Sequence, residues 1–309
     1  MFVSLALALA GAQVIPIVIP LGKPKQIEKP IAPIETYGPF FSTKCKAWDD
    51  YDKAAPPVRI HGNTYLVGTC GISSILIVGS EGDIVIDSGT EAGADLVAAN
   101  IRKLGFNPTD VRILLNSHEH FDHVGGMARL EQLTGGRLYA SADAAEVFKS
   151  GRPGATDPQS ATLPGFPPAR VDRILRDGEQ VRLGNLMVKA IATPGHTNGA
   201  MSWQWVSCDG GVCRRIVYAD SLTPVSAPGY RFSDHPAEVA AFRASIAKVG
   251  ALDCDILLTP HPSASNMPER LALGRPLLDT NACRNYADGL TKQLDERLAK
   301  EKPPVKAKK

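Results

Sequence analysis

The sequence lacks the features that would predict a nucleic-acid or membrane partner. Its 34 basic and 32 acidic residues give a formal charge of only +2, which gives no reason to expect a polyanionic partner. The one apolar run near the length of a membrane span is interrupted by Gln13, Pro16 and Pro20. No internal repeat is visible either. With 44% hydrophobic and 21% charged residues, the 309-residue chain has the composition of a soluble globular protein with one large domain or two small ones.

The apolar stretch at residues 2–10 has no lysine or arginine before it, although a basic start is usual in an export signal. Its length, and the small residues that offer a cleavage site at 8–12, still favour a signal peptide over a membrane anchor. We therefore expect export to the periplasm. Along the chain we expect a signal peptide at 1–12, a Pro-rich leader at 13–40, a folded domain at 41–300 and a solvated basic tail at 301–309.

None of the six cysteines falls in a Cys-x-x-Cys pair, and their even number suits disulfide bonds in an exported protein. A tight turn between two strand-like runs separates Cys208 from Cys213, which predicts a local bridge. Several pairings of the other four remain open. The least entangled of these joins Cys45 to Cys70 and Cys254 to Cys283. The alternative is a set of reduced, buried thiols in a cytosolic protein.

The most informative stretch is His-Glu-His-Phe-Asp-His at residues 118–123. In an extended backbone, side chains two apart point the same way, so His118 and His120 can bind one cation. Asp122 and His123 are neighbours and point apart, so they can reach a second ion beside the first. A buried strand is predicted just before this stretch, at 111–115, and a helix just after it, from Gly125. The cluster therefore lies on a strand-to-helix loop, where sites in α/β sheets usually lie.

Two further histidines also follow predicted strands. His196 lies in the turn Thr193-Pro194-Gly195-His196, and His261 follows an apolar strand at 254–259. A catalytic metal site needs three protein ligands and an open position for water. We therefore group His118, His120 and His196 as the first histidine set, and Asp122, His123 and His261 as the second ligand set. Two ions about 4 Å apart could share one hydroxide.

Strand-like and helix-like blocks alternate along the chain twice, which predicts an α/β fold with two sheets packed face to face and helices outside. At the end of one strand, Asp87 is expected either to orient a ligand histidine from behind or to cap a turn. At the end of another, Asp220 would bridge both metals, and Ser221 and Thr223 would contact substrate. His61 and His235 are expected to be structural or surface residues.

The pattern His-x-His-x-Asp-His, followed by Gly-His and a late histidine, resembles the metallo-β-lactamase superfamily over residues 45–283. The resemblance implies an αββα sandwich of two mixed β-sheets flanked by helices, with the metals at one edge. The segments 46–48, 218–222 and 227–230 are similar to the third subclass of true metallo-β-lactamases. In that subclass one zinc is bound by three histidines, which match the first histidine set. The other is bound by one aspartate and two histidines, which match the second ligand set.

The resemblance also implies a function. A zinc-bound hydroxide would attack the β-lactam carbonyl of penicillins, cephalosporins and carbapenems, with a catalytic role for His118, His120, His196 and Asp122, and would confer antibiotic resistance. Ser221 stands where other subclasses carry a zinc-binding cysteine, and with Thr223 it would hold the antibiotic's carboxylate. Weaker substrate contacts are expected from Tyr230, at the oxyanion, and from Gln159. The three cysteine pairs resemble a disulfide pattern of several members. We expect a monomer that acts on a small molecule.

Two other classes of function remain open. A lactonase or a glyoxalase-type thioesterase shares the six-residue motif and bridges its metals with an aspartate near Asp220, whereas export, disulfides and Ser221 disfavour it. A non-catalytic, zinc-stabilised binding protein is disfavoured because a structural zinc site is normally closed by four protein ligands, and each set here has three.

Overall fold

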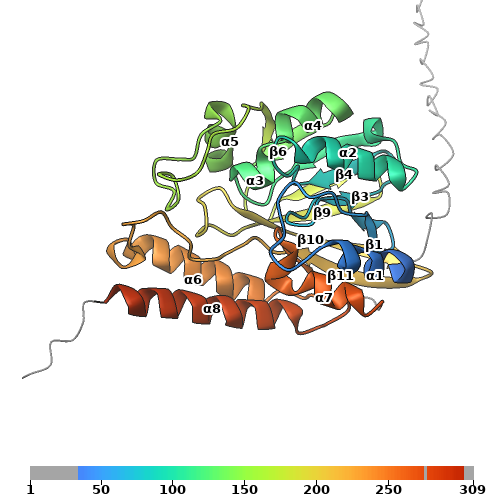
Figure 1. Cartoon of the computed structure of the whole chain (residues 1–309). Helices are drawn as coiled ribbons and strands as arrows, with labels where there is room; N and C mark the ends of the chain where they lie inside the picture. The colour runs from blue at the N-terminus through green and yellow to red at the C-terminus, as the bar shows by residue number, and fades with distance from the viewer. Residues whose placement is uncertain (1–33, 275–276, 303–309) are drawn as a thin grey trace, which may run out of the picture.

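Two β-sheets lie face to face with helices on their outer sides, which confirms the predicted αββα sandwich (Figure 1). The computed structural model describes residues 34–274 and 277–302. The first sheet has seven strands in the order β1 to β7, and the second has five in the order β12-β11-β10-β9-β8. Both sheets are mixed, because β4 to β7 run parallel in the first and β11 pairs with β12 in parallel in the second.

The strands of the first sheet are β1 (Val58–His61), β2 (Thr64–Leu66), β3 (Ile75–Ile77), β4 (Asp83–Ile86), β5 (Val111–Leu115), β6 (Arg137–Ala140) and β7 (Val171–Ile174). Those of the second are β8 (Gln180–Leu183), β9 (Leu186–Ala192), β10 (Met201–Asp209), β11 (Val212–Tyr218) and β12 (Ile256–Leu258). Strand β7 is mostly exposed and has no apolar pattern, so the sequence did not predict it.

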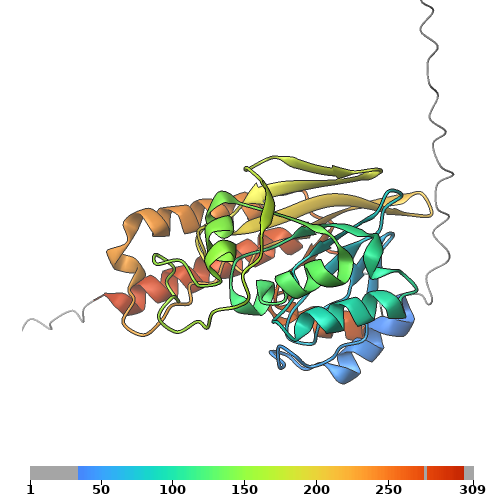
Figure 2. The same ribbon diagram turned by 90° about the horizontal axis from the view of Figure 1, so that it is seen from above.

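The helices fall into three groups. The first sheet is covered by α2 (Gly93–Lys103), α3 (Phe121–Val124), α4 (Met127–Thr134) and α5 (Ala142–Ser150). The second is covered by α6 (Pro236–Gly250) and α8 (Ala282–Glu301), which run side by side in Figures 1 and 2. Helices α1 (Ile34–Lys44) and α7 (Met267–Ala272) pack together and close one side of the layer between the sheets. Short 3₁₀ turns are η1 (Pro108–Asp110), η2 (Phe232–Asp234) and η3 (Pro262–Ser265).

Strand β4 shows why the strands that carry the site are apolar on both faces. Ile84 and Ile86 pack between the sheets, whereas Val85 packs under the helices of the first sheet. A strand covered on both sides is a continuous hydrophobic run rather than an alternating one. The polar residues therefore begin only where each strand ends.

The folded domain is longer at both ends than the sequence indicated. Helix α1 begins at Ile34, so residues 34–40 are helical and do not belong to the Pro-rich leader; Phe41 in the same helix is fully buried. Helix α8 extends to Glu301, whose carboxylate accepts the N–H groups of Phe232 and Ser233. The expected signal peptide and the end of the expected tail lie outside the described residues. Within the described part, no helix has the length and apolar character needed to cross a membrane.

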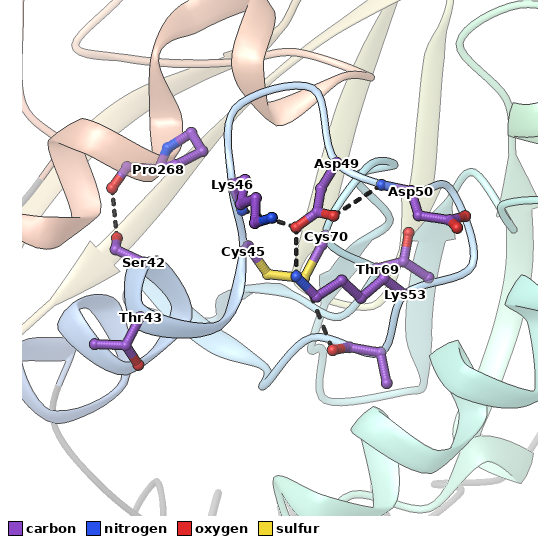
Figure 3. The surroundings of a disulfide bond; sticks show 12 residues. Ser42, Thr43, Cys45, Lys46, Asp49, Asp50, Lys53, Thr69, Cys70 and Pro268 are labelled. Atoms are coloured by element: carbon purple, nitrogen blue, oxygen red, sulfur yellow. Dashed lines mark hydrogen bonds and ion pairs between the residues drawn. A yellow bond between two sulfur atoms is a disulfide. The ribbon is translucent and has the colours of Figure 1, made fainter.

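All six cysteines are paired as the sequence predicted, in the bonds Cys45–Cys70, Cys208–Cys213 and Cys254–Cys283. The first fixes the segment that follows α1 against the loop after β2 (Figure 3). Within that segment, the Asp49 carboxylate accepts the Lys46 N–H and pairs with the Lys53 ammonium at 2.7 Å. The segment that follows α1 is therefore fixed by the disulfide bond at its start and by the Asp49 contacts farther along.

Candidate metal centre

Three segments, each following a strand, bring six ligand-type side chains together. After β5, His118 and His120 lie in the loop, whereas Asp122 and His123 lie in the short helix α3 and not in the loop that the sequence predicted. The loop after β9 carries His196, and the loop after β12 carries His261. In the first histidine set, the ring centroids of His118, His120 and His196 lie 4.7 to 4.8 Å apart. One nitrogen from each ring lies within 4.8 Å of the others, which is a spacing that can hold a metal ion.

The second ligand set is equally close. The Asp122 Oδ2 atom lies 3.2 Å from His123 Nε2 and 3.6 Å from His261 Nε2. The two histidine nitrogens are 3.3 Å apart. The two sets adjoin each other, because a ligand atom of His118 also lies within 4.8 Å of those of Asp122 and His123.

Four histidines are oriented by a hydrogen bond to one ring nitrogen. His118 Nδ1 contacts Asp220 Oδ1 at 2.8 Å, and His120 Nε2 contacts Asp157 Oδ2 at 2.8 Å. The other two histidines bond through Nδ1 to backbone carbonyls. His196 contacts the Thr223 carbonyl at 2.8 Å, and His261 contacts the Gly71 carbonyl at 3.2 Å. Metal-binding histidines are normally held in this way, because the bond fixes the tautomer and leaves the second nitrogen for the metal.

Two of these outer partners have contacts that the sequence did not indicate. Asp220, expected to bridge two metals, is fully buried and bonds to His118 through Oδ1, while its Oδ2 has no hydrogen-bond partner. Asp157 was not predicted at all, because an aspartate in a loop 37 residues beyond His120 carries no local signal. Asp87 lies behind the ligand histidine His123, as the first of its two interpretations predicted, with its Oδ2 3.7 Å from His123 Nδ1. Its carboxylate accepts hydrogen bonds from the N–H and hydroxyl of Ser117 and from the hydroxyl of Tyr218.

The donor set fits divalent metal ions. The Nε2 atom of His118 is buried and has no hydrogen-bond partner, an arrangement that is unfavourable unless another group binds it. Five imidazoles and one carboxylate, with no thiolate, form a nitrogen- and oxygen-rich set of the kind that binds zinc. The unpartnered His118 nitrogen and the close spacing of the ligand atoms both indicate that these residues can hold metal ions.

Burial favours the neutral form of His196 and His261, which is the form that binds a metal. It lowers the pKa of His196 to about 3, helped by the charge of His120, and the pKa of His261 to about 4, helped by His123. Burial also raises the pKa of Asp220 to about 7. For Asp122 burial is outweighed by the neighbouring His123 imidazole, which holds the pKa of that carboxyl below its usual value.

A groove of about 600 Å³ opens over both sets. This volume is in the range of small-molecule sites. Trp48 and Tyr51 form one wall, and their rings lie 5.9 and 5.7 Å from that of His261. Trp48 is 67% exposed, so it is available to a ligand. From the sequence, Trp48 could be identified only as part of a family motif and was not assigned to the site.

Three of the four predicted substrate residues line this groove: Ser221, Thr223 and Gln159. The Ser221 hydroxyl is buried without a partner, and Gln159 Nε2 lies 3.4 Å from His196 Nε2. Tyr230 does not line the groove. Its hydroxyl donates to Glu238 and its ring stacks on His235, so the side chain is already engaged away from the metal ligands.

Helix α8 holds the loop that carries these substrate residues. The Tyr286 hydroxyl donates to the carbonyls of Asp220 and Ser221. Farther along the helix, Arg297 donates to the Ser226 hydroxyl and the Tyr230 carbonyl, at 2.7 and 2.9 Å. The 220–230 loop is therefore fixed to a long helix that is itself tied to the second sheet by the Cys254–Cys283 bond.

Comparison with known proteins gives a consistent result. A family model described as the metallo-beta-lactamase superfamily matches residues 67–261. The solved structure of the MIM-2 metallo-β-lactamase is 53% identical, covers 86% of this chain and 98% of its own, and has a TM-score of 0.83. The structure of MEM-A1, a subclass B3 metallo-β-lactamase from a soil metagenome library, is 42% identical, covers 82% of this chain and 98% of its own, and has a TM-score of 0.79.

Curated relatives are more distant. A hydroxyacylglutathione hydrolase of Rhodopseudomonas palustris (strain BisB18) is 31% identical over 116 residues, which are 36% of this chain and 36% of that protein. The chain thus spans between a third and a half of the length of the first curated relatives that it matches.

Proposed function

The chain belongs to the metallo-β-lactamase superfamily, and on that basis we propose that it is a zinc-dependent β-lactamase of subclass B3 that opens the β-lactam ring of penicillins, cephalosporins and carbapenems. The observation that carries the proposal is the convergence of six ligand-type side chains, from three segments that each follow a strand, under one groove. The likeness to MIM-2 over 98% of that chain supports the same conclusion.

We propose that one zinc is held by the first histidine set and a second by the second ligand set. When bound, zinc supplies a Lewis acid for the carbonyl oxygen and lowers the pKa of a water molecule, which hydrolysis requires. The overall reaction adds this water across the amide C–N bond: a C–O bond forms at the carbonyl carbon, the C–N bond breaks, and the nitrogen takes up a proton.

The residues of the chain orient the reactants. Asp220 and Asp157 hold the rings of His118 and His120, and so fix where a metal can sit. Ser221, with its unpaired hydroxyl, and Thr223 would donate hydrogen bonds to the antibiotic's carboxylate. Gln159 would contact substrate from the side of His196. Trp48 and Tyr51 would cover the apolar part of the molecule and exclude water.

Hydrolysis of a panel of substrates tests the proposal. Purified enzyme is expected to open a carbapenem and a cephalosporin. The reaction is measured as the loss of the β-lactam absorbance. Fast cleavage of S-lactoylglutathione or of a homoserine lactone, without β-lactam turnover, would instead favour the thioesterase or lactonase alternative that the curated relatives represent.

Removal of the carboxylate-binding hydroxyls is expected to weaken substrate binding. Ser221→Ala and Thr223→Val should each raise KM about tenfold with little change in kcat, because each removes one hydrogen bond to a charged group. Steady-state kinetics with a cephalosporin measures this, with Ser233→Ala, an exposed serine outside the groove, as the matched control. An unchanged KM in both variants would show that the carboxylate binds elsewhere.

We also propose that the mature enzyme acts in the periplasm as a monomer, with 41–300 as the core of its domain. The three disulfide bonds support an oxidising compartment.

A further inference from the structure

Glu119 is the one residue of the His-Glu-His-Phe-Asp-His motif, apart from Phe121, that the proposed function does not use. It lies between two zinc-binding histidines, yet its side chain is only 3% exposed and does not line the groove. Within residues 34–274 and 277–302, no lysine, arginine or histidine forms an ion pair with its carboxylate. A buried carboxylate without a counter-ion is costly unless it is well hydrogen-bonded.

Both of its oxygens are used, and both reach the loop that carries His196. Oε2 accepts the hydroxyl of Thr197 at 2.7 Å, and Oε1 accepts the N–H of Gly199 at 2.9 Å. Thr197 is the residue directly after His196. The carboxylate therefore joins two separate ligand-bearing loops: Glu119 adjoins His118 and His120, and Thr197 adjoins His196.

The surroundings of Gly199 show that this contact is tightly built. The Gly199 carbonyl accepts the hydroxyl of Ser141 at 2.8 Å, at the start of α5. A Cβ atom at Gly199 would lie 2.8 Å from Glu119 Oε1 and 2.5 Å from the Ala144 nitrogen, closer than real Cβ contacts. The peptide is thus held between the Glu119 carboxylate on one side and the first turn of α5 on the other.

We propose that Glu119 is a positioning residue that sets the place of His196 relative to His118 and His120 through its two hydrogen bonds. Zinc affinity then depends on Glu119, although Glu119 is not itself a ligand. The inference rests on the proposed zinc-binding function of the first histidine set.

Two substitutions at Glu119 separate hydrogen bonding from charge. Glu119→Gln keeps both contacts, because the amide oxygen can accept the Gly199 N–H and the amide nitrogen can donate to the Thr197 hydroxyl. Glu119→Ala removes both. Thr197→Val is nearly isosteric and removes one contact from the other side, so it tests the same bond without a change in the motif.

Zinc affinity of the metal-free protein, titrated with Zn²⁺ in competition with a chromogenic chelator, is the readout. Loss of groups that orient metal ligands typically weakens binding about 10- to 100-fold. We expect a loss of that size at one of two sites for Glu119→Ala, a smaller loss in the same site for Thr197→Val, and binding within about threefold of native for Glu119→Gln. Thermal unfolding of each metal-free variant checks its fold, and the Thr197→Val result decides the test if Glu119→Ala does not fold.

The matched control is Asp177→Ala, which removes a carboxylate bonded to the Ala192 N–H but not to the His196 loop. Its zinc affinity should equal the native value. Glu119→Gln binding zinc as weakly as Glu119→Ala would overturn the positioning role, as would native affinity in both Glu119→Ala and Thr197→Val. If native protein bound no zinc, the proposed function itself would fail, which is a different result.

Discussion

Replacement of His196 by alanine is expected to lower kcat/KM for β-lactam hydrolysis by about a thousandfold or more, without unfolding the protein. His196 supplies the one ligand of the first histidine set that comes from a different loop, and its ring is already oriented by the Thr223 carbonyl. Its loss leaves two ligands, fewer than the three protein ligands of a catalytic zinc site. The three layers of core residues do not include His196, so they remain intact.

Steady-state kinetics, together with thermal unfolding of the metal-free protein, measures this prediction. His61→Ala is the matched control, because the His61 ring contacts the Val212 carbonyl beside the β10–β11 turn and lies outside the groove. That variant should retain native activity. Full activity in the His196 variant would contradict the assignment of the first histidine set.

Removal of metal by a chelator such as dipicolinate is expected to reduce hydrolysis to background, and added Zn²⁺ to restore it. Metal should be essential because the described side chains in the groove offer orientation and hydrogen bonds, but no activated nucleophile other than a metal-bound water. Mg²⁺ should not restore activity, since it prefers oxygen ligands and the two sets offer mainly imidazole nitrogens.

Circular dichroism before and after chelation is the control for this experiment. Three disulfide bonds and the apolar layers should preserve the fold without metal. A metal-free enzyme that still opened β-lactams at the native rate would contradict the zinc-dependent mechanism.

The fold could be predicted from sequence because its signals are local. Apolar strands such as β5 and amphipathic helices such as α2 are each visible within about a dozen residues, and polar clusters mark where the strands end. The motif at 118–123, together with histidines after two other strands, was enough to predict that six ligand-type side chains lie at one edge of the sheets. Turn chemistry was equally informative at the Cys208–Cys213 hairpin.

The rest of the site depends on contacts between distant segments. Asp157 bonds to His120 and Tyr286 to the carbonyl of Ser221 across long sequence separations, and neither has a pattern that points to its partner. Trp48 reaches the groove because a disulfide bond and the Asp49 contacts fix its segment (Figure 3). The contact of Tyr230 was hidden for the same reason: its partner Glu238 lies in α6, and local sequence could not show that this hydroxyl is engaged.

The zinc content of the purified protein, measured by mass spectrometry of the metal after dialysis, tests the central claim most directly. We expect two ions per chain in the native protein, and one in the His196→Ala and Asp122→Ala variants, because each substitution disables a different ligand set. A native protein with no more than one zinc per chain at full activity, or variants that keep both ions, would show that these six side chains do not form two metal sites.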